Sequence, residues 1–122
     1  MGGERTRFPA SVYRHGAEPD ARFSLANERT FLAWIRTGLA FLAAGLALEL
    51  LGLDLHAVLR LSAALTLIAT GAVVPVLAWI GWARTERAMR GGDPLPSSSM
   101  APVVGAAVVV TGVLLLLAIV LR

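Results

Sequence analysis

The chain has 122 residues, of which 57% are hydrophobic and only 16% are charged. Soluble domains carry about 25% charged residues and disordered chains lack apolar ones, so this composition argues against a soluble enzyme and excludes disorder. The formal net charge is +3, lysine is absent and there is no cysteine. Disulfides, iron–sulfur clusters and thiolate zinc sites are therefore excluded, and we expect no nucleic-acid partner.

Three long apolar segments predict three membrane-spanning helices, because about 20 apolar residues cross a bilayer. We expect helices over about residues 21–53, 58–90 and 100–121, within one domain over residues 21–122. The short connection after the first segment predicts an antiparallel hairpin, and Pro75 predicts a kink in the second helix. The predicted fold is an all-α membrane protein with three transmembrane helices.

The segments outside these helices are short and polar. Residues 1–20 predict a mobile cytoplasmic tail, and Gly91-Gly92 followed by a serine-rich stretch predicts a helix stop and a flexible linker. The pattern of a removable signal peptide does not precede the first apolar segment, so we expect that segment to remain as a span.

The arginines predict the orientation in the membrane, because positive residues concentrate in cytoplasmic segments. Six arginines precede the apolar part of the first span and three follow the second, whereas the first connection holds only Arg60 and the C-terminus only Arg122. This distribution places the N-terminus in the cytoplasm and the C-terminus outside. Trp34, Trp79 and Trp82 then fall at the cytoplasmic interface, where tryptophan is enriched.

Arg22, Arg29 and Arg36 recur every seven residues, which returns a helical side chain to within about 20° of the same face. The row is about 21 Å long, and alanines continue the face deeper into the span. One interpretation is anchoring to lipid phosphates. The other is a cationic vestibule for an anion, because guanidinium forks bind phosphate oxygens bidentately. Arg84 and Arg87, at the end of the second helix, are expected to complete that vestibule.

Four other polar residues stand in or near the first span. We expect Glu28 to form a salt bridge with an arginine of the second helix, with proton carriage as the alternative. Asn27 and Thr30 are expected to cap helix ends or to bond between helices. Glu49 is a functional candidate because intramembrane carboxylates are costly, but its shallow depth favours pairing with Arg60 or exposure to water.

Glycines mark two further faces. Gly38, Gly45 and Gly52 repeat every seven residues opposite the arginine row, and Gly105 and Gly112 do so in the third helix. Small residues let helices approach closely in lipid, so we expect these faces to pack against other helices, in the same chain or in a neighbour. Three helices cannot enclose a pore, so conduction would require an oligomer or a larger complex.

The stretch over residues 23–37, F-S-L-A-N-E-R-T-F-L-A-W-I-R-T, resembles a known signature. It is similar to the N-E-R-T-x-L-A-W-x-R-T pattern of the domain-of-unknown-function 202 family, also called YidH-like. The resemblance covers about residues 20–121. It implies a small three-helix protein of the plasma (inner) membrane.

The same family resemblance extends to the membrane domain of the vacuolar transporter chaperone, a eukaryotic polyphosphate polymerase complex. That domain assembles around a central path for polyphosphate, with basic residues at its cytoplasmic side. Carried over by motif, these imply anion contacts at Arg22, Arg29 and Arg84, and less directly at Arg87. Arg36 belongs to the bacterial-type signature only. Polyphosphate synthesis is not implied, because this chain has no polymerase domain.

Two functions follow as hypotheses. The first is an oligomeric membrane protein whose arginine vestibule binds or passes phosphate-containing anions such as polyphosphate. The alternative is a non-conducting accessory subunit of a membrane complex, with its arginines on phospholipid headgroups; Gly45→Leu would then abolish partner capture. We find no nucleophile–base pair, metal-ligand cluster or phosphate-binding glycine loop, so we expect no enzyme, metal or cofactor.

Overall fold

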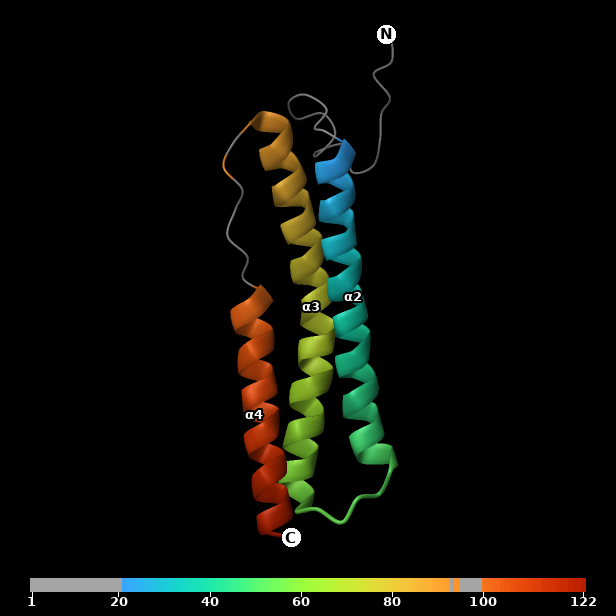
Figure 1. The fold of residues 1–122 in the computed structure, drawn as a ribbon. Helices are drawn as coiled ribbons and strands as arrows, with labels where there is room; N and C mark the ends of the chain where they lie inside the picture. Colours follow the sequence, from blue (N-terminus) through green and yellow to red (C-terminus); the bar gives the residue numbers. More distant parts are fainter. Residues whose placement is uncertain (1–20, 93, 95–99) are drawn as a thin grey trace.

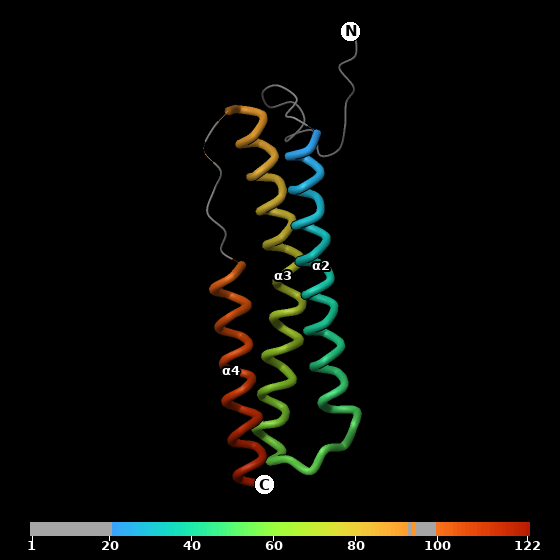
Figure 2. Tube along the Cα trace, in the orientation of Figure 1, coloured from blue at the N-terminus to red at the C-terminus, as the bar shows by residue number. Residues whose placement is uncertain are grey.

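The computed structural model describes residues 21–92, 94 and 100–122, which form three helices (Figure 1, Figure 2). These are α2 (Ala21–Leu50), α3 (Ala57–Gly91) and α4 (Met100–Val120). At 1.5 Å per residue they measure about 45, 52 and 31 Å. Each is long and apolar enough to cross a membrane, so the predicted three-span, all-α architecture is confirmed.

The helix boundaries differ slightly from those predicted. α2 ends at Leu50, earlier than expected, because Gly52 takes the left-handed conformation (φ 62°) and turns the chain. Gly52 therefore belongs to the turn and not to the helix-packing face on which we had placed it. α3 begins after His56, whose Nδ1 accepts a hydrogen bond from the Leu59 amide at 3.4 Å. The helix runs unbroken through Pro75.

At its other end, α3 stops at Gly92, which has φ 70° and donates its amide to carbonyls of the last helical turn. This left-handed cap is the predicted helix stop, and glycine adopts it without steric cost. The predicted mobile tail over residues 1–20 and most of the predicted linker lie outside the described residues.

α3 is the central helix. It packs against α2 on one side and α4 on another, whereas α2 and α4 do not pack against each other. Figure 1 shows that α2 and α3 extend well past the first residue of α4 at the end where α2 begins. The chain thus forms the predicted hairpin, and α4 packs along the half of α3 that is farther from the start of α2.

The hairpin is held by close backbone contact through glycine. A Cβ atom on Gly45 would lie 2.6 Å from Ile68 Cγ1 and 2.8 Å from the Ala64 carbonyl oxygen. One on Gly38 would lie 3.2 Å from the Gly71 oxygen. At Gly45 a Cβ atom would overlap its neighbours, and at Gly38 it would make an unusually tight contact. The predicted packing role of Gly38 and Gly45 is therefore realised within the chain's own hairpin.

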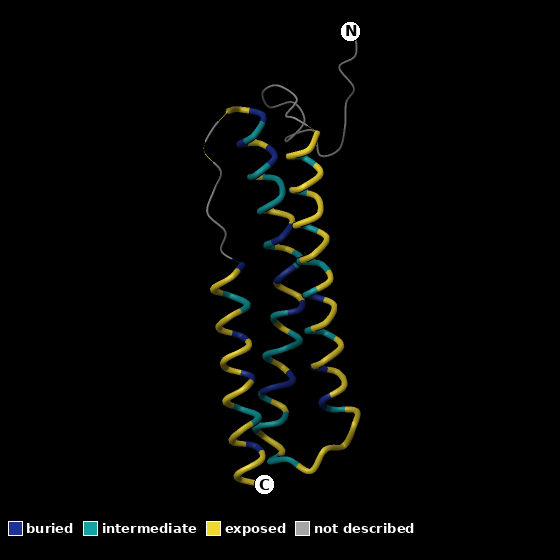
Figure 3. Tube along the Cα trace, viewed as in Figure 1, coloured by how far each residue is buried: buried dark blue, intermediate teal, exposed yellow. Residues whose placement is uncertain are grey.

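The buried core is small: Figure 3 shows few buried residues and many exposed ones along all three helices. One cluster joins Leu48 of α2 to Ala63 and Ala64 of α3, with Leu114 and Leu115 of α4 beside it. The second cluster joins Val74 and Ala78 to Met100, with Phe31, Trp34 and Val104 packed around them. Both clusters lie where α3 meets its two neighbours, so the outer faces are left for lipid or for another protein.

Candidate functional site

A buried carboxylate joins α2 to α3 at the end where α2 begins. Glu86 is only 3% exposed. It accepts hydrogen bonds from Ser24 Oγ at 2.8 Å and from Asn27 Nδ2 at 3.3 Å. Asn27 Nδ2 also donates to the Trp82 carbonyl oxygen at 3.0 Å. A charged acceptor with two donors is a strong link, and it fixes the first turns of α2 against α3.

The sequence reasoning missed Glu86 and placed the interhelical ion pair at Glu28 instead. Glu28 is exposed and forms no ion pair with any residue described. Thr30, which we expected to cap a helix or to bond between helices, donates to the Ala26 carbonyl oxygen of its own helix. Helix geometry explains the difference. Asn27 lies within about 20° of Gly38 on the α2 surface, so it faces α3, whereas Glu28 is rotated by about 100°. Because Asn27 shares a face with the glycines, the sequence indicated that it packs against α3. A polar side chain on a packed face needs a hydrogen-bond partner, and this was the signal for a polar residue on α3.

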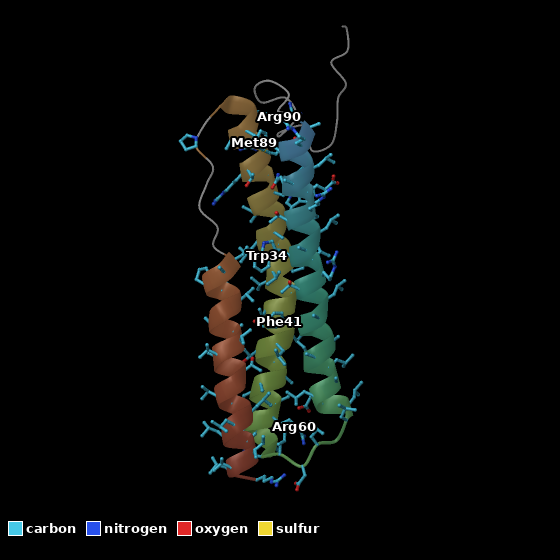
Figure 4. The ribbon with its side chains drawn as sticks, in the orientation of Figure 1. Trp34, Phe41, Arg60, Met89 and Arg90 are labelled. Atoms are coloured by element: carbon cyan, nitrogen blue, oxygen red, sulfur yellow. The ribbon has the colours of Figure 1, made fainter. Side chains whose placement is uncertain are left out.

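Aromatic residues of α2 and α3 pack together next to this polar contact. The rings of Phe31 and Trp79 lie 6.1 Å apart in an edge-on arrangement, and those of Trp79 and Trp82 lie 5.2 Å apart. Trp34, labelled in Figure 4, packs against the cluster that Val74, Ala78 and Met100 form. The aromatic rings thus link α2 to α3 next to the polar contact, and the placement of the tryptophans at the cytoplasmic interface stays a prediction.

The arginine row lies on the outer side of α2. With Asn27 as reference, Arg29 and Arg36 are rotated by about 200° and 180°, which is the side opposite α3. Both are exposed, as is Arg22. Within the described part of the chain, Arg29 and Arg36 form no ion pair. The guanidinium groups of Arg29 and Arg36 are therefore available to a ligand from outside the hairpin.

The register of the hairpin fixes the level of Arg36 against α3. Arg36 precedes Gly38 by two residues, about 3 Å along the axis, and Gly38 packs against Gly71 and Pro75. Those two residues stand near the middle of the uncharged stretch of α3 over residues 61–83. The Arg36 backbone is also only two residues, about 3 Å, from that of Trp34, which packs against the cluster that includes the first residue of α4. The position of Arg36 at the membrane interface stays a prediction.

Arg84 and Arg87 do not converge with this row in one chain. Because Glu86 faces α2, Arg84 is rotated by about 160° from the α2 contact and Arg87 by about 100°. Both are exposed. The vestibule that we predicted from all five arginines is thus not closed by a single chain, in which the hairpin separates Arg84 from the α2 row.

A second polar contact closes the opposite end of the hairpin. Arg60 Nε lies 3.1 Å from Glu49 Oε1, and the same guanidinium donates to the Leu53 carbonyl oxygen at 3.0 Å (Figure 4). The pairing expected for Glu49 is therefore present. The His56 amide donates to the Ala118 carbonyl oxygen at 3.0 Å and ties the start of α3 to the end of α4.

The chemistry open to the arginine face is anion binding. Among the described residues, no group of three or more histidine, cysteine or acidic side chains is placed to hold a metal ion. Exposed guanidinium groups in a row offer paired N–H donors that match phosphate or carboxylate oxygens.

Comparisons with known proteins agree with this architecture. Residues 22–88 match the family described as Domain of unknown function (DUF202). The chain is 42% identical over 106 residues to a protein named inner membrane protein YidH from Escherichia coli strain K12, an alignment that covers 86% of this chain and 92% of that protein. The values are the same for the proteins of that name from Escherichia coli O157:H7 and Shigella flexneri. The search of solved structures found no match.

Proposed function

We propose that this chain, which belongs to the DUF202 family and is an inner membrane protein with three membrane-spanning helices, binds phosphate-containing anions along its arginine row. Polyphosphate is the anion class that we favour. The proposal assigns the contacts to Arg22, Arg29 and Arg36, at the cytoplasmic end given by the arginine distribution. It assigns the protein no catalytic step.

The observation that carries this proposal is Arg36, an exposed arginine inside α2, one of the three helices long and apolar enough to cross a membrane. A charged side chain in hydrocarbon costs about 3 kcal/mol or more, so such residues mark ligand paths or polar partners. Arginine side chains on a helix lean toward its N-terminus, which here brings the Arg36 guanidinium toward Arg29. Clustered like charges repel, and a polyanion removes that repulsion.

The test is anion binding by purified protein in nanodiscs of zwitterionic lipid, with polyphosphate as the probe. Arg36→Gln and Arg29→Gln are expected to weaken binding at least fivefold and to flatten its dependence on salt, because each removes a charged contact. Arg84→Gln, on the opposite side of the hairpin, is the matched control and is expected to change binding less than twofold. Equal binding by wild type and both α2 variants would refute the proposal.

The same experiment separates two sources of phosphate. Nanodiscs with anionic phospholipid are expected to compete with free polyphosphate if headgroups reach the row. If only anionic lipid is bound, the arginines act as headgroup contacts, as the accessory-subunit alternative requires.

The accessory-subunit alternative is favoured by the open glycines of α4. A Cβ on Gly105 or Gly112 would meet nothing within 4 Å among the described residues, so neither glycine is needed for close packing against them. Gly45, which we first chose to test partner capture, is unsuitable because it packs against α3. Gly112→Leu is the informative variant: loss of a co-purifying membrane protein, with Arg36→Gln neutral, would favour the alternative.

A further inference from the structure

One face of α3 changes from apolar to basic along its length, on the side that α2 does not cover. With Glu86 as reference, Val73, Ile80 and Arg87 follow one another at seven-residue spacing, at about 140°, 120° and 100° around the helix. Arg84 lies beside them at about 160°. All four are exposed, and we call them the outer face of α3. Its apolar part continues into the two arginines with little rotation about the helix axis.

The two arginines of the outer face have no counter-charge in the part of the chain that the structure describes. Neither Arg84 nor Arg87 forms an ion pair there. Glu86 is the only acidic residue of α3, and its buried carboxylate accepts hydrogen bonds from Ser24 and Asn27 of α2. Because this carboxylate is turned away from the outer face, the described residues leave two positive charges there without an acidic neighbour.

The direction of α3 inclines these two side chains toward the membrane. A helical side chain leans toward the N-terminus of its helix. In α3 that direction leads back along the uncharged stretch over residues 61–83, so Arg84 and Arg87 lean toward the apolar part of the span. α2 runs the opposite way, so Arg29 and Arg36 lean away from the apolar part of theirs. The α3 arginines are therefore directed to the membrane surface and the α2 row to the water beyond it.

Both guanidinium groups can reach one phosphate group. Arg87 follows Arg84 by three residues, which is about 4.5 Å along the axis and about 60° around it. Arginine forks donate paired N–H groups to phosphate oxygens, so a phosphate between the two side chains receives donors from both. Ile80 stands about 6 Å before Arg84 and Val73 about 10 Å further into the span. A chain of hydrocarbon attached to that phosphate would lie along these two residues.

We propose that the outer face of α3 is a binding site for an anionic phospholipid. Arg84 and Arg87 hold the phosphate of the headgroup, and an acyl chain lies along Ile80 and Val73. The occupant is a lipid because the face that carries the charges continues as exposed apolar residues of a helix long enough to cross a membrane. Basic residues beside a span attract anionic lipids.

This site is separate from the arginine row of α2. The two basic surfaces lie on different helices, and the hairpin stands between Arg84 and the row. The inference therefore goes beyond the proposed function and does not depend on it: the α2 row takes a soluble polyanion, whereas the outer face of α3 takes a lipid. Variants of one surface are expected to leave the other working.

Native mass spectrometry in mild detergent tests the site, with phosphatidylglycerol as the probe and phosphatidylcholine of the same acyl chains as the reference. The wild type is expected to prefer phosphatidylglycerol. Arg84→Gln with Arg87→Gln is expected to lower that preference by about fivefold for each arginine. The matched control is Arg29→Gln with Arg36→Gln, which removes the same charge from α2 and is expected to change the preference less than twofold. Equal losses in the two double variants, or no preference in the wild type, would overturn the inference.

Competition separates a lipid from a soluble phosphate. Glycerol phosphate, which has the headgroup phosphate but no acyl chains, is expected not to displace phosphatidylglycerol at equal concentration; displacement would show a site for phosphate alone and overturn the assignment to a lipid.

Polyphosphate binding, measured in zwitterionic nanodiscs, reports the proposed function separately. The α3 double variant is expected to keep polyphosphate binding and to lose the lipid preference, and the α2 double variant the reverse. Lipid preference without polyphosphate binding would refute the proposed function alone. Polyphosphate binding without lipid preference would refute this site alone.

Discussion

The two sides of α2 use small residues for different purposes. On the side toward α3, Gly38 and Gly45 are buried and bring two backbones into contact. On the opposite side, Ala40 and Ala47 are exposed and continue the face of the arginine row beyond Arg36. On the first side a Cβ atom would crowd α3, whereas the second side is exposed in the part of the chain that the structure describes. Small residues at helical spacing therefore indicate close approach, but only the structure shows which surface has already been used.

Polar residues show the same contrast. Asn27 and Ser24 find their acceptor within the hairpin at Glu86, whereas Arg29 and Arg36 point away from it. Polar groups on the packed side serve stability, because an unsatisfied group there would be costly. Those on the outer side add nothing to the hairpin, and this is why we assign the ligand contacts to them.

The largest expected effect on stability comes from a larger side chain on the side of α2 that packs against α3. Gly45→Leu is expected to destabilise the hairpin by about 3 kcal/mol or to prevent its folding, because even a Cβ overlaps Ile68 and the Ala64 carbonyl. Ala43→Leu, on the exposed side, is expected to change stability by less than about 0.5 kcal/mol. Unfolding in detergent, followed by tryptophan fluorescence, measures both. Equal losses would contradict the division of α2 into two sides.

A smaller effect is expected from the buried carboxylate. Glu86→Ala leaves the Ser24 hydroxyl and the Asn27 amide without their acceptor, at a cost of about 2 kcal/mol. Arg87→Ala, next to it but exposed, serves as the control and is expected to be nearly neutral. The same fluorescence-monitored unfolding applies. A neutral Glu86→Ala would show that this end of the hairpin is held by its aromatic contacts instead.

The smallest effect on stability is expected at the end of the hairpin where α2 connects to α3. The Glu49 and Arg60 side chains are 33% and 24% exposed, so their ion pair is expected to contribute no more than about 1 kcal/mol. A double-mutant cycle with Glu49→Gln and Arg60→Gln measures the coupling energy. A coupling well above that value would indicate that lipid shields this pair from water and would make Glu49 a stronger functional candidate.

Hydropathy predicted the three spans and their approximate bounds, because about 20 apolar residues in a row have no other stable placement than a bilayer. The seven-residue spacing likewise placed the arginines on one face and the glycines on another, since the rotation of a residue about the helix axis follows from its position in the sequence. The pairing of Glu49 with Arg60 was also predictable, as both stand beside the same short connection.

Contacts between helices needed the tertiary structure. The role of Glu86 as the buried acceptor, the level of Arg36 against α3 and the open side of Gly112 all depend on how α2, α3 and α4 are rotated and shifted against one another. Sequence periodicity defines the faces of each helix, but it does not state which face meets which neighbour or at what register. That choice is made by close packing: a Cβ at Gly45 would overlap the Ala64 carbonyl of α3, so the two backbones could not approach as they do.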